Sequence, residues 1–216
     1  MTIDEYKERF TEDDAVGWLS IDQSLEKVYK DQKPQHFAPI LHYAIGGEDP
    51  LDGISVYESE EQVPHYHIVS YGFSNLYYDE DAAGNEYSKF GFEMTFRLKK
   101  NPKDDNFAWA CNLMQNLAKY VFKTGKWFDE YHFIPANGPI RLEYETDITA
   151  IAFVLDPELG EMETPNGKVM FLQMVGLTTS EYENLKLNPK TTETKKLLDN
   201  LQKENPLLIT DLDRKS

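Results

Sequence analysis

Residues 90–98 alternate strictly between large apolar side chains and other residue types, and this pattern constrains the fold more than any other part of the chain. The apolar positions are Phe90, Phe92, Met94, Phe96 and Leu98. The positions between them are Gly91, Glu93, Thr95 and Arg97. Successive side chains of a β-strand point to opposite faces, so the alternation predicts a half-buried strand. Full burial of each large side chain stabilises a fold by roughly 1.5–3 kcal/mol, which makes this strand a major core element.

Further strands are predicted around this one. Residues 148–155 and 168–175 are apolar on both faces, which is typical of central strands that are covered on both sides. The other predicted strands are 36–45, with an irregularity at Pro39, 53–59, 63–73 and 207–210.

Helices are predicted by apolar spacing and by end signals. The first is capped by Asp13 or Asp14 and runs to Tyr29, and the others cover 107–123, 178–186 and 192–204. Residues 104–106 supply the N-terminal caps of the predicted helix 107–123, and Gly125 ends it. The sequence therefore predicts an α+β fold with a mixed, largely antiparallel central sheet packed with helices.

The organisation of the chain predicts one domain over residues 1–216. No repeat, Gly/Ser-rich linker or low-complexity tract divides it, so we expect a core of about 36–212 and an N-terminal helical segment, 1–33. No apolar stretch reaches the roughly 18 residues that a membrane span needs, and the first residues are acidic, unlike a secretory signal. The single cysteine, Cys111, excludes an internal disulfide. These features predict a cytoplasmic protein.

The formal net charge of −16 argues against nucleic acid and anionic membranes as partners, because both would be repelled. Six carboxylates and no Lys or Arg occupy 48–61, and nine carboxylates accompany Arg141 alone over 129–163. Two interpretations stay open. The acidic surface merely keeps the protein soluble, or it attracts a basic protein partner and speeds its association.

No residue pattern predicts a catalytic or metal site. His65 and His67 lie two apart and so share one face of a strand, but no second ligand pair accompanies them. Structural histidines are the favoured interpretation. Cys111 lacks the basic neighbours of a reactive thiolate and is expected in the core. The acidic pairs Asp79/Asp81 and Glu161/Glu163 lack EF-hand spacing, and phosphate-binding and nucleophile motifs are absent. We therefore expect no enzyme activity, no metal and no cofactor.

Two pairs of adjacent aromatic residues, Tyr77-Tyr78 and Trp127-Phe128, are candidates for an interface. Neighbouring side chains of an extended chain point to opposite faces, so at least one ring of each pair is expected at the surface. Exposed aromatic rings beside carboxylates suit the centre of a protein interface. The alternative is that these rings cap an edge of the sheet.

Several ordered blocks of the chain, from about Pro39 to the C-terminus, resemble the Suppressor of fused domain. They are His65-Tyr-His67, Ser70-Tyr-Gly-Phe-Ser-Asn-Leu-Tyr77, Phe90-Gly-Phe-Glu-Met-Thr-Phe-Arg-Leu98, Trp109 with residues 113–122, Asp156-Pro-Glu-Leu159, Thr164-Pro-Asn-Gly167, Phe171-Leu-Gln-Met-Val-Gly176 and Leu208-Ile-Thr-Asp-Leu212. The resemblance implies a domain that holds another protein. In animals, the family clamps a short peptide strand between two lobes, and this chain resembles the first lobe alone.

Short, single-domain bacterial relatives of this family are linked to immunity proteins that neutralise polymorphic toxins. The resemblance therefore implies a bacterial immunity-type protein that binds a basic toxin domain. The alternative is a peptide-binding adaptor or regulator with a cellular, non-toxin partner. A third, less favoured hypothesis is a metal-dependent enzyme centred on His65 and His67.

The resemblance also implies a binding face, because an aspartate that contacts the peptide in the animal proteins matches Asp79. Tyr78 stands where the family usually has glycine, which changes the shape of that loop. The residues predicted to bind the partner are Tyr71, Asn75, Tyr77, Tyr78, Asp79 and Asp81.

Overall fold

A mixed sheet of eight strands forms the centre of the molecule in the computed structural model, which describes residues 2–216. The strand order is β1-β2-β3-β4-β8-β6-β5, and β7 pairs with β8 beside this path. The strands are β1 Gln35–Phe37, β2 Gly53–Ser59, β3 His65–Tyr71, β4 Tyr87–Lys99, β5 Phe133–Pro135, β6 Ile148–Leu155, β7 Glu161–Thr164 and β8 Gly167–Thr178. Adjacent strands run antiparallel except for β4 and β8, which run parallel. The predicted α+β class is confirmed.

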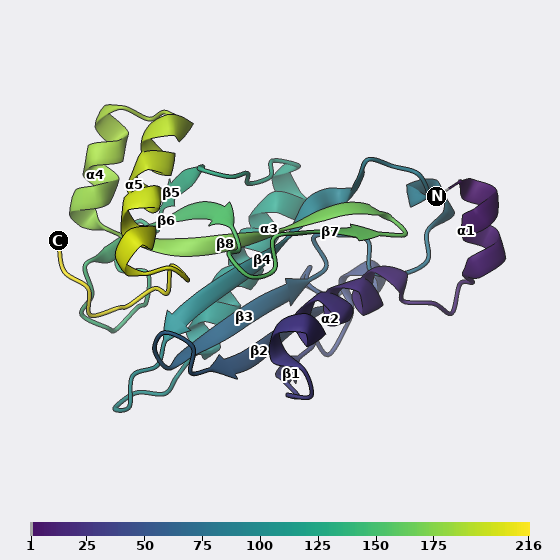
Figure 1. Ribbon diagram of the computed structural model, residues 1–216, viewed down its shortest axis with the longest axis horizontal. Coiled ribbons are helices and arrows are strands. Elements are labelled where there is room, and N and C mark those ends of the chain that lie inside the picture. The colour runs from purple at the N-terminus through teal and green to yellow at the C-terminus, as the bar shows by residue number, and fades with distance from the viewer. Residues whose placement is uncertain (1) are drawn as a thin grey trace.

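The helices are α1 Ile3–Arg9, α2 Val16–Tyr29, α3 Ala108–Thr124, α4 Thr179–Leu187 and α5 Thr191–Glu204, with short 3-10 turns η1 Tyr43–Ile45 and η2 Glu80–Ala82. Helices α2 to α5 cover both faces of this sheet, and α1 lies beside η2 at one end of it. Helix α3 packs on the face that presents Met94 and Phe96. Helix α2 packs on the opposite face, over Phe171, and α4 and α5 cover that same face farther along β8, over Val175 and Leu177 (Figure 1).

Two of the predicted strands are much shorter than expected. Within 36–45, only the first residues pair with β2, and Tyr43–Ile45 form η1. Pro39 explains the break, because proline has no N–H for a ladder and restricts the residue before it. Residues 207–210 contribute a single parallel bridge between Leu98 and Thr210 in place of a strand.

The helix starts also differ from the predicted ones. Helix α2 begins at Val16 without a side-chain cap, because the Asp14 carboxylate accepts hydrogen bonds from the backbone and side chain of Thr11 instead. The separate helix α1 was not predicted within the N-terminal segment, and it begins with a reciprocal capping box between Thr2 and Glu5. Gly125 ends α3 in the left-handed conformation, as predicted.

The second face of β4 is buried, contrary to the half-buried strand that the alternation predicted. Glu93, Thr95 and Arg97 are all 0% exposed. The sheet is covered on this face by α2 at one end and by α4 and α5 at the other, which leaves these polar side chains inside the molecule.

Cys111 lies half-buried on α3 against the apolar core, and burial raises the pKa of its thiol to about 11. The thiol is therefore protonated at neutral pH and a poor nucleophile. None of the helices described over residues 2–216 has the length and apolar character to cross a membrane.

Candidate functional site

The loop between β3 and β4 carries most of the residues predicted to bind a partner. Tyr77 is 46% exposed and Asp81 is exposed, whereas Asn75, Tyr78 and Asp79 are half-buried. Tyr71 is separate from this surface. It is 1% exposed at the end of β3, and its hydroxyl donates to Asp22 Oδ1 at 2.8 Å. Its ring is therefore not exposed on the surface of this loop.

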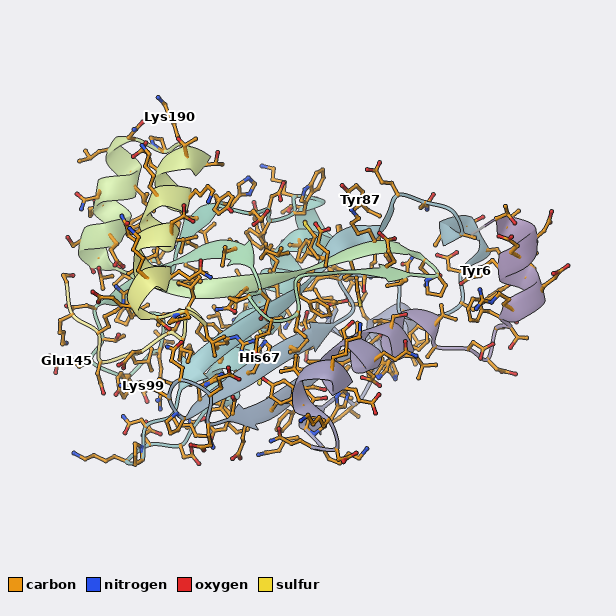
Figure 2. The ribbon with its side chains drawn as sticks, in the orientation of Figure 1. Tyr6, His67, Tyr87, Lys99, Glu145 and Lys190 are labelled. Atoms are coloured by element: carbon orange, nitrogen blue, oxygen red, sulfur yellow. The ribbon has the colours of Figure 1, made fainter. Side chains whose placement is uncertain are left out.

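The loop is fixed by Asn166, which is fully buried in the turn between β7 and β8. Its Nδ2 donates to the carbonyl oxygens of Asn75 at 3.0 Å and of Tyr77 at 2.8 Å. Its Oδ1 accepts a hydrogen bond from the Tyr6 hydroxyl at 2.6 Å. That hydroxyl in turn accepts from the backbone N–H of Asp79 at 3.0 Å, so helix α1 is tied to the same loop (Figure 2).

The start of the loop is held by the buried carboxylate of Glu93. It accepts the Ser70 and Ser74 hydroxyls, each at 2.6 Å, and the backbone N–H groups of Gly72 and Ser74, each at 2.9 Å. Burial raises the pKa of Glu93, and these hydrogen bonds oppose that shift. One side chain of β4 therefore sets the path of the chain as it leaves β3.

The polar groups of the loop also bond to one another. The Asp79 carboxylate accepts Asn75 Nδ2 and the backbone N–H of Asp81, each at 3.1 Å. The Tyr78 hydroxyl donates to Glu80 at 2.9 Å, and burial followed by this hydrogen bond raises the pKa of Tyr78 to about 12. The loop is thus fixed by its own hydrogen bonds, and its exposed face presents the Tyr77 phenol and several carboxylates.

A hollow of about 590 Å³ lies where β4 and β8 begin, beside the end of α3. Tyr87 and Trp127 stand at its rim, 46% and 60% exposed, and Phe90 and Met170 line it. Phe128 also lines the hollow, but it is only 5% exposed and its ring stacks on Phe153. The expectation that at least one ring of each aromatic pair is exposed therefore holds for both Tyr77-Tyr78 and Trp127-Phe128.

Some of the carboxylates in the acidic stretches pair with a buried arginine instead of facing solvent. Of the nine carboxylates over 129–163, Asp156 is 1% exposed and lies 3.1 Å from Arg97 Nη2, and Glu158 lies 2.8 Å from the same nitrogen. The pKa of the Tyr77 phenol is raised. Burial is the larger cause, and the nearby Asp52 carboxylate is the second. Carboxylates thus adjoin the exposed aromatic rings.

The two histidines considered as metal ligands are buried, and the nitrogens of both rings have protein partners. His67 lies 2.7 Å from the Tyr29 hydroxyl and 3.0 Å from Asp156. His65 lies 2.8 Å from the Val63 carbonyl and 3.2 Å from Arg97. Burial, aided by the Arg97 charge, lowers the pKa of His67 to about 4. Over residues 2–216, no group of three or more His, Cys, Asp or Glu side chains is placed to hold a metal ion.

Tyr6, Glu93 and Asn166 are the positioning residues that sequence reasoning missed. The turn signal Pro165-Asn166-Gly167 placed Asn166 in a tight turn, but nothing in the sequence indicated that this turn reaches a loop 90 residues earlier. Glu93 occupied a position expected to face solvent, and Tyr6 carried no signal at all.

Comparisons with known proteins agree with this architecture. The family model described as Suppressor of fused protein (SUFU) matches residues 47–215. The Suppressor of fused homologs of Homo sapiens and Mus musculus are each 36% identical over 176 residues, which cover 76% of this chain and 36% of the relative. The chain thus spans about a third of the length of these relatives.

Solved structures show the same fold. A chain of the Sufu–Fu complex crystal structure superposes with a TM-score of 0.84 at 30% identity, over 94% of this chain and 92% of that one. Drosophila Suppressor of Fused superposes with a TM-score of 0.83 at 30% identity, over 95% of this chain and 52% of that one. The chain therefore belongs to the Suppressor of fused family.

Proposed function

We propose that the chain acts as one protein-binding domain and that its binding face includes the 75–81 loop and the hollow at Trp127. Lys89, which lines this hollow, donates to the Gly72 carbonyl oxygen near the start of the loop at 2.7 Å. The observation that carries this proposal is the combination of exposed rings, Tyr77, Tyr87 and Trp127, with a loop fixed by buried hydrogen bonds. A surface that is already ordered loses little conformational entropy when a partner binds. Large rings in such a setting are typical anchors of protein interfaces.

A non-catalytic role is supported by the state of the chemically active groups. The thiol of Cys111 has a raised pKa, and the ring nitrogens of both His65 and His67 bond to protein groups. A relative of known structure is named for its complex with another protein, Fu, which is consistent with a protein partner for this chain.

The finer proposal is a bacterial, cytoplasmic immunity-type protein that neutralises a toxin domain. The net charge of −16 and the carboxylates beside the exposed rings favour a basic partner. The expected test is co-expression with the product of the adjacent upstream gene. That product alone should arrest growth, and this chain should restore growth and co-purify with it. Normal growth with the product alone would contradict the immunity role.

Binding at the proposed face is tested with variants. Tyr77→Ala and Trp127→Ala should each weaken the purified complex by about tenfold or more, the loss typical of an interface anchor. Leu187→Ala is the matched control, because Leu187 is 85% exposed on α4 and distant from the face. The association rate should also fall as salt is raised. Equal affinities for all three variants would place the interface elsewhere.

A peptide-binding adaptor is the second candidate, favoured by an irregularity in the sheet. Tyr87 pairs with Lys168 and Phe92 pairs with Met170, so four residues of β4 lie opposite one residue of β8. Backbone that lacks a regular ladder beside an apolar hollow suits an added extended peptide. Recovery of an endogenous regulator from cells, with binding lost in Trp127→Ala, would favour this candidate over the toxin partner.

A further inference from the structure

A second hollow lies on a different surface, between α2 and the strands β1 and β2. Its volume is about 380 Å³, and aromatic rings form much of its lining: Trp18, Tyr29, His36 and Tyr57. It shares no lining residue with the hollow at Trp127. An inference about it does not depend on the function proposed above.

The rings of this hollow are held by one another. Trp18 packs on His36 at 5.3 Å and on Tyr71 at 4.5 Å between ring centroids, and Tyr29 stacks on Tyr57 at 4.2 Å. Gly53 makes this possible. A Cβ on that residue would lie 2.5 Å from the His36 ring and 3.0 Å from the Trp18 ring. The aromatic lining is therefore built into the packing of the sheet edge.

Two carboxylates from successive turns of α2, Asp22 and Glu26, also line the hollow. Asp22 is fixed by the Tyr71 hydroxyl, which donates to its Oδ1 at 2.8 Å. Tyr57 is 7% exposed and lines the hollow, yet its hydroxyl has no hydrogen-bond partner within residues 2–216. The hydroxyl oxygen itself is reached by solvent, so it is open to the hollow and available to a donor of a ligand.

The hollow has an acidic and a basic end. Trp18 and Asp22 lie near the start of α2, whereas Lys30 and Lys33 follow its end. At a rise of about 1.5 Å per residue, Trp18 and Lys30 are separated by roughly 18 Å along the helix. A cation is therefore favoured at the Trp18–Asp22 end, which lies farther from these two lysines than the Tyr29 end does.

We propose that this hollow binds a single guanidinium group, presented as an arginine side chain of a polypeptide. A planar guanidinium stacks on aromatic faces and donates to carboxylates in a fork, which matches Trp18 beside Asp22. The Tyr57 hydroxyl, which lines the same hollow and has no other hydrogen-bond partner within residues 2–216, offers an acceptor for the remaining donors. The apolar stem of an arginine fits the aromatic wall, as long cationic side chains do elsewhere.

The test follows the indole N–H signal of Trp18 in two-dimensional NMR spectra, assigned with Trp18→Phe. The probes are Nα-acetyl-arginine methylamide, its neutral analogue Nα-acetyl-citrulline methylamide, and free L-arginine. The blocked arginine should shift the Trp18 signal saturably, and the citrulline compound should not. A shift of equal size with citrulline, or no shift with the blocked arginine, would overturn the proposal. Binding of free arginine alone would overturn its assignment to a polypeptide.

Two matched variants distinguish a loss of binding caused by the missing charge of Asp22 from one caused by misfolding. Asp22→Asn keeps an oxygen to accept from Tyr71 but removes the charge, and it should weaken blocked arginine about tenfold, the loss of one charge-assisted hydrogen bond. Asp31→Asn removes a charge close by in sequence at a residue that does not line the hollow, and it should leave the affinity unchanged. Equal affinities of the two variants would overturn the role of Asp22. Thermal unfolding of both shows that each remains folded.

Discussion

The two faces of strand β4 are equally buried but are stabilised by different physics. One face places Phe92, Met94 and Phe96 against α3, and all three are 0% exposed. The other face places Glu93, Thr95 and Arg97 in the interior, also at 0% exposure. Apolar burial is non-directional and tolerates small changes of shape. Buried polar groups are stable only while each has its partner.

On the polar face, Thr95 and Arg97 belong to one connected network, whereas Glu93 bonds separately to Ser70, Gly72 and Ser74. The Arg97 guanidinium donates to Gln173 at 3.2 Å and to Asp156 at 3.1 Å, and it contacts His65. Asp156 also accepts from Thr95 at 2.8 Å. In Figure 2, His67, which bonds to Asp156, lies between α2 and the C-terminal helices. This face therefore specifies the register of β4 through geometry, whereas the other face contributes apolar burial.

The largest expected effect comes from breaking this network. Asp156→Ala leaves the buried Arg97 charge with Glu158, at 2.8 Å, as its remaining carboxylate partner and removes the acceptor of Thr95 and His67. It should lower the free energy of unfolding by about 3 kcal/mol, the lower end of the loss for a broken buried ion pair, because Glu158 still offsets part of the charge. Urea unfolding followed by circular dichroism measures the change. As a control, the double variant Arg97→Met/Asp156→Leu removes both charges and should be less destabilised than Asp156→Ala alone. A double variant that is as unstable as Asp156→Ala would refute the role of the weakened pairing of the Arg97 charge.

A second prediction concerns pH. The pKa of His67 falls from its ordinary 6.5 to about 4 in the folded protein, because the ring is buried beside the Arg97 charge. Between these values the unfolded chain binds a proton that the folded chain does not. Stability is therefore full above about pH 6.5 and is lost as the pH falls toward 4, by about 3 kcal/mol in total.

The variant His67→Gln isolates this contribution. An amide accepts from Tyr29 and donates to Asp156 as the neutral ring does, but it does not titrate over this range. Its unfolding free energy should vary less with pH than that of the wild type between pH 6.5 and 4. Parallel curves for the two proteins would show that another group causes the dependence.

A third, smaller loss of stability is expected from Glu93, the buried residue of β4 that holds the start of the 75–81 loop. Glu93→Gln keeps the size of the side chain but turns an NH₂ group toward donors such as Gly72 and Ser74. The loss should be about 1.5–3 kcal/mol, the value of hydrogen bonds to a charged group. Amide hydrogen exchange should rise in residues 72–79 more than in α3. A uniform rise over both segments would show that Glu93 does not act specifically on the loop.

The same contrast explains what could be predicted from the sequence. The alternation over 90–98, the two-sided apolar runs at 148–155 and 168–175, and the stop at Gly125 are local patterns, and the strands and helix end that they predict are present. Burial of Glu93 and Arg97 was not predictable, because a polar residue on an alternating strand normally faces water. Only the packing of distant helices over that face reverses the expectation.

The candidate site shows the same limit. Exposure of one ring in each of two aromatic pairs follows from backbone geometry alone and was predicted. Burial of Tyr71 depends on Trp18, 53 residues earlier, and the fixing of the loop depends on Tyr6 and Asn166. Hydrogen bonds between distant segments leave no periodic signal in the sequence, so these contacts could be found only in the folded chain.

The smallest effect is expected on the apolar face, and it tests the comparison most directly. Phe96→Leu keeps an apolar side chain in the core, so neighbours of Phe96 can relax around it, and the loss should stay below about 1.5 kcal/mol. Thr95→Val on the opposite face changes the shape less but removes a donor from Asp156, and it should cost about 1–3 kcal/mol. Urea midpoints of the two variants decide the matter. If Phe96→Leu proved the more destabilising, shape complementarity would determine the stability of both faces. The polar face of β4 would then not be the more sensitive of the two to substitution.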